Sequence, residues 1–363
     1  MPIDEYFAQS YSEARRKFVD AATQAGSGLA SYVLPDRSGP TNEELVVDVA
    51  RIGSQEPRNL LLIISGTHGV EGFCGSGCQV GYFAEQLFQA LPADTGAVLI
   101  HALNPYGFAW LRRVDQCNVD LNRNFLNFCS TLPFSSEYDA IHNMLVPADW
   151  DGPQRQQADA ALKNYIADKG LRAVQAAVQG GQYSHPDGLF YGGKKESWSN
   201  LMLHRILLEH VSDQVKNVAV LDLHTGLGPA GYGEPIYLGP ADNFERAQQW
   251  YGSCVKNPAK GDSISAIVVG SIADGLTKAL PHSRTIYLAL EYGTLSMFEV
   301  LTALRADNWL HAVANQQSPL ASSIKQQIRA AFYVDAPYWK AAVGDIEDVP
   351  EGLLVTIRRS KTD

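Results

Sequence analysis

The chain has 363 residues, of which 45% are hydrophobic and 19% are charged, and its net charge at pH 7 is −10. This composition is ordinary for a globular protein. The acidic balance argues against nucleic-acid binding, which needs clustered lysine and arginine. No apolar run approaches the roughly 20 residues of a membrane helix, and the start lacks the pattern of a signal peptide. We therefore expect a cytoplasmic protein that binds neither nucleic acid nor a membrane.

The length permits two domains, although one large α/β domain with insertions fits as well. Hydrophobic periodicity predicts the elements of the first part. Residues 4–24 are expected to form a helix, and residues 28–44 an irregular connection or an edge strand. The predicted strands that follow cover 44–52, 60–65 and 98–103, with a helix over 77–91 between the last two.

Residues 130–215 read as a helical insertion, with helices expected at 154–166, 171–178 and 197–211. Further strands are predicted at 218–224, 236–238, 264–269 and 285–291. Helices are predicted at 243–255, 295–313 and 320–332. The tail from 333 to 363 shows no clear pattern.

A glycine-rich turn follows the continuous apolar run from Leu60 to Ile64 and carries His68 and Glu71. In open α/β sheets, ligands bind at the carboxyl ends of the strands. An imidazole and a carboxylate three residues apart can turn toward one ion, which makes them half of a possible zinc site. Alone, however, this pair is weak evidence, because a histidine in a turn is more often a surface or capping residue.

Two later strands end in the same kinds of side chain: His224 follows one apolar strand and Glu291 follows another. Each has an ordinary structural reading, His224 as a core histidine and Glu291 as the cap of a helix that begins near Ser296. Taken together with His68 and Glu71, they give two histidines and a carboxylate, which is a catalytic zinc set. The remaining glutamate, Glu291, is then the natural general base for a water molecule.

The stretch from Arg112 to Phe125 contains three arginines and five asparagine or aspartate side chains. It has few periodic apolar residues, so its composition suits the binding of an anion better than a connector.

Cysteines offer a further possibility for metal binding, because Cys74 and Cys78 follow the His68 turn. They would serve as soft metal ligands, but small buried packing residues are the commoner case. The odd count of five cysteines does not suggest a disulfide framework.

At these motifs the sequence resembles the zinc carboxypeptidase superfamily, which includes succinylglutamate desuccinylase and aspartoacylase. His68 and Glu71, in His-Gly-Val-Glu, stand where the family has its first two zinc ligands, and His224, in Leu-Asp-Leu-His-Thr-Gly, stands where it has the third. Glu291, in Ala-Leu-Glu-Tyr-Gly-Thr, matches the catalytic glutamate. The segment 119–125, Val-Asp-Leu-Asn-Arg-Asn-Phe, is close to the family signature.

The resemblance implies further roles. Asn122 and Arg123 correspond to residues that hold the terminal carboxylate of a substrate, Arg113 suits the arginine that polarises the scissile carbonyl, and Asp120 suits the carboxylate behind the first histidine. It also implies one zinc ion per chain. The implied fold is a single three-layer α/β/α domain with a mixed, mainly parallel sheet of about eight strands and the insertion at about 130–215. The chain looks most like an uncharacterised bacterial branch of the superfamily.

The leading hypothesis is thus a zinc-dependent hydrolase that cleaves an amide bond next to a free carboxylate. Both a carboxypeptidase acting on a peptide and an N-acyl amino acid deacylase acting on a small molecule fit it. A metal-dependent binding protein without turnover is an alternative, although an intact Glu291 argues against it. A serine or cysteine hydrolase is poorly supported, because Ser65 and Ser76 do not lie in Gly-x-Ser-x-Gly.

The roles of several residues have more than one interpretation. Asp222 shares a strand face with His224 and is either a support for that histidine or a structural hydrogen-bonding residue. No convincing motif identifies the family's mobile tyrosine among Tyr232, Tyr237 and Tyr251. The segment from Gly188 to Gly193, with His185 and Tyr191, forms either a pocket wall or lid or, as the safer interpretation, a structural loop. Oligomeric state is not predicted.

Overall fold

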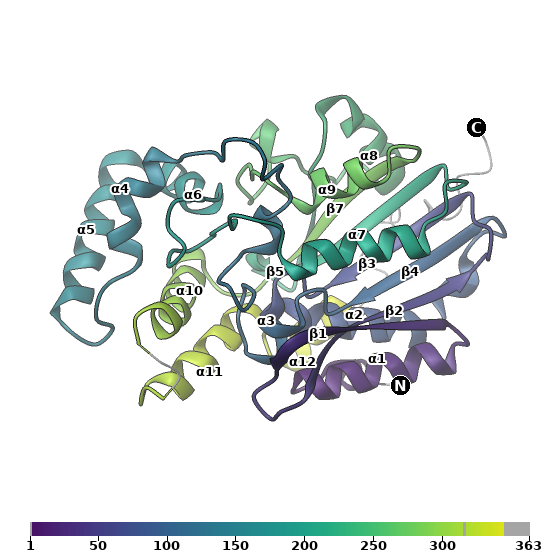
Figure 1. The fold of residues 1–363 in the computed structure, drawn as a ribbon, viewed down its shortest axis with the longest axis horizontal. Coiled ribbons are helices and arrows are strands. Elements are labelled where there is room, and N and C mark those ends of the chain that lie inside the picture. The colour runs from purple at the N-terminus through teal and green to yellow at the C-terminus, as the bar shows by residue number, and fades with distance from the viewer. Residues whose placement is uncertain (1, 315–316, 345–363) are drawn as a thin grey trace.

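The computed structural model describes residues 2–314 and 317–344, and these residues form a seven-stranded sheet flanked by helices (Figure 1). The strand order across the sheet is β1-β2-β4-β3-β5-β7-β6. In chain order, the strands are β1 (Gly28–Ser38), β2 (Glu44–Gly53), β3 (Asn59–Ser65), β4 (Thr95–His101), β5 (Asn217–Ala230), β6 (Gly233–Tyr237) and β7 (Arg284–Gly293).

The sheet is mixed, and its four central strands β4, β3, β5 and β7 run parallel to one another. At the edges, β1 and β2 pair antiparallel on one side and β6 pairs antiparallel with β7 on the other. The expected α/β fold with a mixed sheet is confirmed, with seven strands in place of about eight. The strand predicted at 264–269 is wrong, because this segment is a loop whose backbone bonds to the end of a helix.

Residues of the central strands alternate between two hydrophobic cores, one on each face of the sheet. Leu61 and Ile63 of β3 belong to one core, and Leu60, Leu62 and Ile64 belong to the other. Helices α1 (Tyr11–Gln24), α2 (Gly72–Ala84), α8 (Phe244–Tyr251) and α12 (Pro337–Gly344) contribute to the first core. Helices α7 (Trp198–His210) and α9 (Ile272–Ala279) contribute to the second, which gives the three layers.

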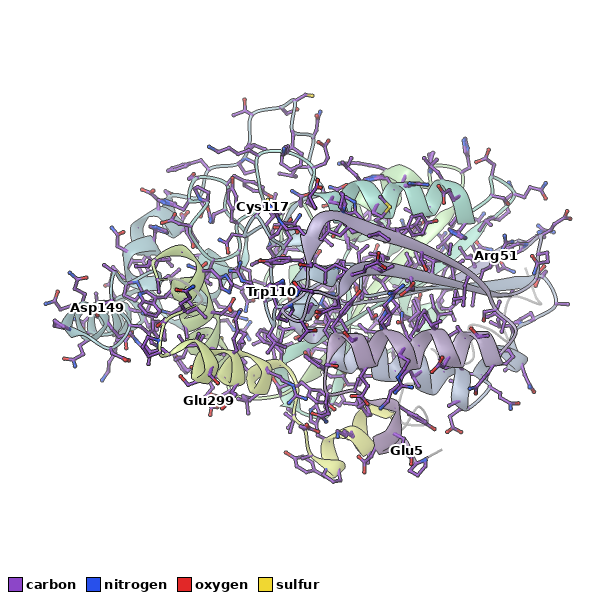
Figure 2. The ribbon with its side chains drawn as sticks, turned by 60° about the horizontal axis from the view of Figure 1, so that its bottom comes forward. Glu5, Arg51, Trp110, Cys117, Asp149 and Glu299 are labelled. Carbon is purple, nitrogen blue, oxygen red and sulfur yellow. The ribbon has the colours of Figure 1, made fainter. Side chains whose placement is uncertain are left out.

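A third core lies among helices beyond the carboxyl ends of the parallel strands. It involves α4 (Ser136–Leu145), α5 (Pro153–Lys169), α6 (Leu171–Gln179), α10 (Met297–Ala312) and α11 (Ala321–Phe332). Figure 1 shows α4, α5 and α6 together at one end of the molecule, with α10 and α11 beside them. Polar side chains such as Glu5 and Glu299 lie exposed at the periphery (Figure 2).

Helix α2 begins earlier than the sequence predicted, at Gly72 instead of residue 77, and ends at Ala84 instead of residue 91. Its glycines lower helix propensity, which hides the first turn from sequence reasoning. They also let the helix approach its neighbours: a Cβ atom on Gly75 would lie 2.7 Å from Cβ of Ser65, and one on Gly77 would lie 2.3 Å from the Phe7 ring. Close packing thus outweighs propensity here.

We expect His101, at the end of β4, to make stability depend on pH. Its ring is buried and stacks on Phe18 at 4.6 Å, and burial lowers the pKa of His101 to about 4. Between pH 6.5 and about 4 the unfolded chain binds a proton that the folded chain does not, so the free energy of unfolding falls as the pH falls, by up to about 3 kcal/mol. Denaturant unfolding between pH 7 and 4.5 should therefore show a smaller fall in the free energy of unfolding for His101→Phe than for wild type. The variant of the exposed His282, His282→Phe, should show the same fall as wild type. Equal slopes for wild type and His101→Phe would contradict this.

No helix among the described residues is both long enough and apolar enough to cross a lipid bilayer.

Candidate metal centre and active-site cleft

The sheet brings the predicted site residues to one edge, although they lie on three different strands or loops. His68 follows β3, and His224 of β5 stands directly opposite Glu291 of β7 in the strand register. Both of these residues lie inside their strands instead of after them, because β5 and β7 continue to Ala230 and Gly293. The carboxyl-end edge of the parallel strands is where α/β sheets bind ligands.

The turn that carries His68 is held tightly against the segment that carries the arginines. The backbone N–H groups of Gly69 and Val70 donate to the carbonyl oxygens of Arg113 and Arg112, at 3.1 Å and 2.8 Å. A Cβ atom on Gly69 would lie 2.1 Å from the backbone of Gly107, so only glycine permits this contact. The glycine-rich turn therefore fixes the position of His68 relative to Arg113.

Donor atoms of three side chains converge at this edge. Nδ1 of His68 lies 3.0 Å from one carboxylate oxygen of Glu71, and Nδ1 of His224 lies 3.0 Å from the other. The two Nδ1 atoms are 3.1 Å apart. Ligands bound at about 2.1 Å to one tetrahedral zinc ion lie roughly 3.4 Å from one another, so this triangle has nearly the size that such an ion requires. These three residues form a group able to hold a metal ion.

The far side of each imidazole faces a buried carboxylate. Nε2 of His68 lies 3.2 Å from Asp120, and Nε2 of His224 lies 3.0 Å from Asp222. Burial opposes the charged form of His224, but Asp222 and Glu71 outweigh it and hold the pKa of His224 above its ordinary value. Metal-binding histidines usually have a carboxylate beside the ring nitrogen that does not bind the metal, which leaves the Nδ1 atoms of His68 and His224 to face the ion.

The charges around the triangle also favour a cation. Six ionisable side chains other than the histidines surround it: the carboxylates of Glu71, Asp120, Asp222 and Glu291 and the guanidinium groups of Arg113 and Arg123. Counted together, they leave two negative charges without a permanent partner. Buried charges without a counter-charge are costly, so a divalent ion at the triangle fits both the donor geometry and the charge.

Arg113 lies against the metal-binding group. Its Nε donates to Asp120 at 2.9 Å and its Nη1 donates to Glu71 at 3.0 Å, while Nη2 lies 2.8 Å from Nε2 of His68. The guanidinium also lines the cleft, 4.9 Å above the ring of Phe190. The structure places Arg113 beside His68 and Glu71, and its contact with a substrate carbonyl stays a prediction.

Glu291 is partly exposed in the same cleft and accepts a hydrogen bond of 3.0 Å from the backbone N–H of Leu227. Burial and the neighbouring Glu71 raise the pKa of Glu291 above its ordinary value. Its carboxylate is not one of the three donors that form the triangle, so it is free to accept a proton from a water molecule in the cleft.

Asn122 and Arg123 also line the cleft, but much of their hydrogen-bonding capacity is already used. Arg123 donates from Nε and Nη2 to the carbonyl oxygen of Gln179 and from Nη1 to that of Asn122. The Asn122 side chain accepts from the backbone N–H of Ile272. A guanidinium has five N–H groups, so two remain on Arg123 beyond these three bonds. Binding of a substrate carboxylate by these residues stays a prediction.

The candidate tyrosines lie elsewhere, since no tyrosine of the described residues lines this cleft. Tyr237 donates to the carbonyl oxygen of Pro240, Tyr251 is buried and Tyr232 is half exposed. Within the 188–193 segment, the backbone carbonyl of Tyr191 accepts from the N–H of Asp120, and His185 contacts Asp139. These two residues have structural contacts outside the cleft.

A second group of possible metal ligands consists of His142, His185 and Asp187. Its two imidazole rings stack at 3.9 Å with only 18° between their planes. Nitrogen lone pairs lie in the ring plane, so stacked rings do not point at one ion, unlike the rings of the first group. Cys74 is buried among hydrophobic residues, and neither Cys74 nor Cys78 belongs to either group.

Sequence reasoning missed two residues that support the site. Thr67 and Tyr287 each donate a hydrogen bond of 2.8 Å to Asp222 and so hold the carboxylate that faces His224. Phe190, from the 188–193 segment, lines the cleft in the left-handed conformation, with φ at 51°, so this segment contributes to the pocket wall, which was the less favoured expectation. Thr67 adjoins His68 and Tyr287 lies on the Glu291 strand, but only the pairing of β5 with β7 brings Tyr287 to Asp222.

Comparisons with known proteins give similar solved structures at low identity. Carboxypeptidase A from Helicoverpa armigera is 13% identical, with a TM-score of 0.47 over 91% of this chain and 75% of that chain. Thrombin activatable fibrinolysis inhibitor is 12% identical, with a TM-score of 0.44 over 90% and 78%. A Shewanella amazonensis SB2B protein, described as belonging to the succinylglutamate desuccinylase/aspartoacylase family, is 17% identical, with a TM-score of 0.34 over 73% and 66%.

These proteins belong to the same groups that the motifs of the sequence indicated. No curated protein matches the chain. A family model described as protein of unknown function (DUF2817) matches residues 7–345, which is most of the sequence. The chain therefore belongs to the DUF2817 family.

Proposed function

We propose that this protein is a zinc-dependent hydrolase that cleaves an amide bond next to a free carboxylate. The observation that carries the proposal is the convergence of the Nδ1 atoms of His68 and His224 on the two oxygens of Glu71, with a carboxylate behind each histidine. Two histidines and one glutamate, with further coordination open to the cleft, are the donor set of catalytic zinc sites.

The reaction divides among the side chains of the cleft as follows. A zinc ion, when bound, supplies Lewis acidity and makes a water molecule acidic enough to ionise near neutral pH. Glu291 accepts the proton of the attacking water and passes it to the departing amine. Arg113 donates a hydrogen bond to the oxygen that becomes negative, and Asp120 and Asp222 keep the two imidazoles oriented.

The free carboxylate is assigned to Asn122 and Arg123, which line the same cleft. Arg123 is buried and keeps two N–H groups beyond its backbone bonds, so it is able to bind a carboxylate without first breaking those bonds. Lysine at this position would lose the planar geometry. Both a peptide with a free C-terminus and an N-acyl amino acid carry such a carboxylate, so both substrate classes belong to the proposal.

The test is a hydrolysis screen with zinc-loaded protein on two panels, short peptides and N-acyl amino acids, each with a methyl-ester counterpart. We expect turnover of one panel, loss of turnover after treatment with a chelator, recovery when zinc is returned, and resistance to serine- and thiol-directed reagents. The esters should react at least tenfold more slowly because they lack the charge that Arg123 binds. Turnover that survives complete removal of metal would contradict the proposal.

A further inference from the structure

A second cavity adjoins the metal cleft, between α6 and α10, and the two cavities share part of their lining. Gln179, Phe190, Leu227, Val300 and Leu304 line both. Leu227 is also the residue whose backbone N–H binds Glu291, and Gln179 is the residue whose carbonyl binds Arg123. The second cavity therefore begins directly beside the groups assigned to chemistry and to substrate binding.

The wall of this cavity is apolar. Among the described residues no ionisable side chain lines it, and its polar side chains, Gln175 and Gln179, bond to each other and to the 264–269 loop that precedes α9. Val174 and Val178 of α6 face Val300 and Leu304 of α10 across it, and all four are buried. A wall without charges or unpaired polar groups binds apolar groups and rejects charged ones.

The mouth of the cavity keeps large apolar side chains in contact with water. Leu171, the first residue of α6, is 40% exposed, and Phe298, the second residue of α10, is 51% exposed. Exposed apolar residues that continue an apolar cavity mark a binding site more often than a packing defect.

Phe190 forms the partition between the two cavities. Its backbone has a φ of 51°, which a bulky side chain rarely adopts, and its ring lies 4.9 Å and 5.5 Å from the guanidinium carbons of Arg113 and Arg123. Strained backbone at a ligand site is kept only where the surrounding structure enforces it. Here it places the ring within contact of both arginines and next to the apolar cavity.

We infer that the α6–α10 cavity binds an apolar group of the substrate close to the scissile amide, so the substrate class is an amide with one apolar arm and one free carboxylate. The inference rests on the proposed function, because only a hydrolase would treat the bound ligand as its substrate. The binding of apolar groups itself does not depend on turnover. The apolar arm is either the acyl chain of an N-acyl amino acid or the side chain of a peptide residue, and the two sources share this chemistry.

Binding to zinc-loaded Glu291→Gln protein, measured by calorimetry, tests the inference without turnover. One series lengthens the acyl chain of N-acyl-glycine from acetyl to octanoyl, and the other changes the amino acid of N-acetyl compounds from glycine to leucine and phenylalanine. Affinity should rise about three- to fourfold for each buried methylene in one of the two series. The series that responds identifies the source of the apolar arm.

The variants Leu171→Asp and Phe298→Asp place a charge at the mouth of the cavity. Both residues lie in the first turn of a helix, where aspartate is favourable, so the fold should tolerate them. Each should lower the affinity for the longest ligand at least tenfold and leave N-acetyl-glycine unchanged. Leu201→Asp, at a leucine of α7 that is 55% exposed away from the cleft, is the matched control.

Flat affinities in both series, no binding at all, or a chain-length trend that Leu171→Asp and Phe298→Asp leave intact would overturn the inference. If ligands bind with the expected trend but wild type turns over none of them, the apolar site stands and the proposed hydrolase activity fails. If turnover occurs without any preference for apolar groups, the proposed function stands and the apolar site fails.

Discussion

Glu291→Gln should abolish hydrolysis while leaving the metal in place. A positioned general base contributes about 10²–10⁴-fold to a reaction rate, and glutamine cannot accept the proton of the water. Glu291 is not among the three converging donors, and the carbonyl oxygen of glutamine can still accept from the N–H of Leu227. We therefore expect a fall in kcat of at least a hundredfold, with an unchanged zinc content and unchanged thermal unfolding.

Glu71→Gln is the matched comparison, because it changes a glutamate in the same cleft that does belong to the donor group. It should lose both zinc and activity. The pH profile separates the roles further: burial and Glu71 raise the pKa of Glu291, so wild-type activity should fall on the acidic side as Glu291 takes up a proton. Any residual activity of Glu291→Gln should lack this limb. Near-normal kcat for Glu291→Gln would remove Glu291 from the mechanism.

Asp307→Asn should cause a large loss of stability, because it neutralises one member of a buried cluster of charges. The Asp307 carboxylate is buried between Arg112 at 3.1 Å and Lys325 at 2.5 Å. Burial alone would raise its pKa, but Lys325 and Arg112 hold the pKa of Asp307 at about 2. Removing one member of a buried ion pair leaves an uncompensated charge and costs about 3–5 kcal/mol. Denaturant unfolding at pH 7 measures this loss directly.

The control is Asp20→Asn, which removes the exposed partner of Arg16 on α1. Exposed pairs contribute about 0–1 kcal/mol, so the midpoint of unfolding should barely move. Asp307→Asn also loosens Arg112, whose carbonyl binds the turn of His68, so zinc affinity should fall with stability. A loss below about 1 kcal/mol would show that the cluster around Asp307 is not a stabilising network.

Much of the site was predictable because its residues follow apolar strands in recognisable motifs. His68, Glu71, His224 and Glu291 lie together at one sheet edge, as the parallel order of β3, β5 and β7 requires. Tyr287 and Thr67 were not predictable, because their roles depend on hydrogen bonds to Asp222 across neighbouring strands. The place of Phe190 depends on the packing of a long segment whose motifs carry no chemistry.

The errors in the predicted secondary structure have local causes. The apolar run at 264–269 has strand composition, yet its backbone bonds to the carboxyl end of α6 and its Ile267 is 63% exposed. The predicted start of α2 was too late because its first turn is rich in glycine, which has low helix propensity. This turn is helical because of its close packing and not because of its propensity. The tail from residue 333 has no pattern that predicts an element, and its part from 345 to 363 lies outside the described residues.

Metal content tests the central claim most directly. Elemental analysis of protein purified without chelator should find close to one zinc ion per chain in wild type and in His185→Ala, and almost none in His224→Ala. His185 belongs to the group with stacked rings, so its variant controls for zinc bound outside the cleft. Wild-type protein that neither contains nor takes up zinc, or a His224→Ala variant that keeps it, would contradict the proposed metal centre.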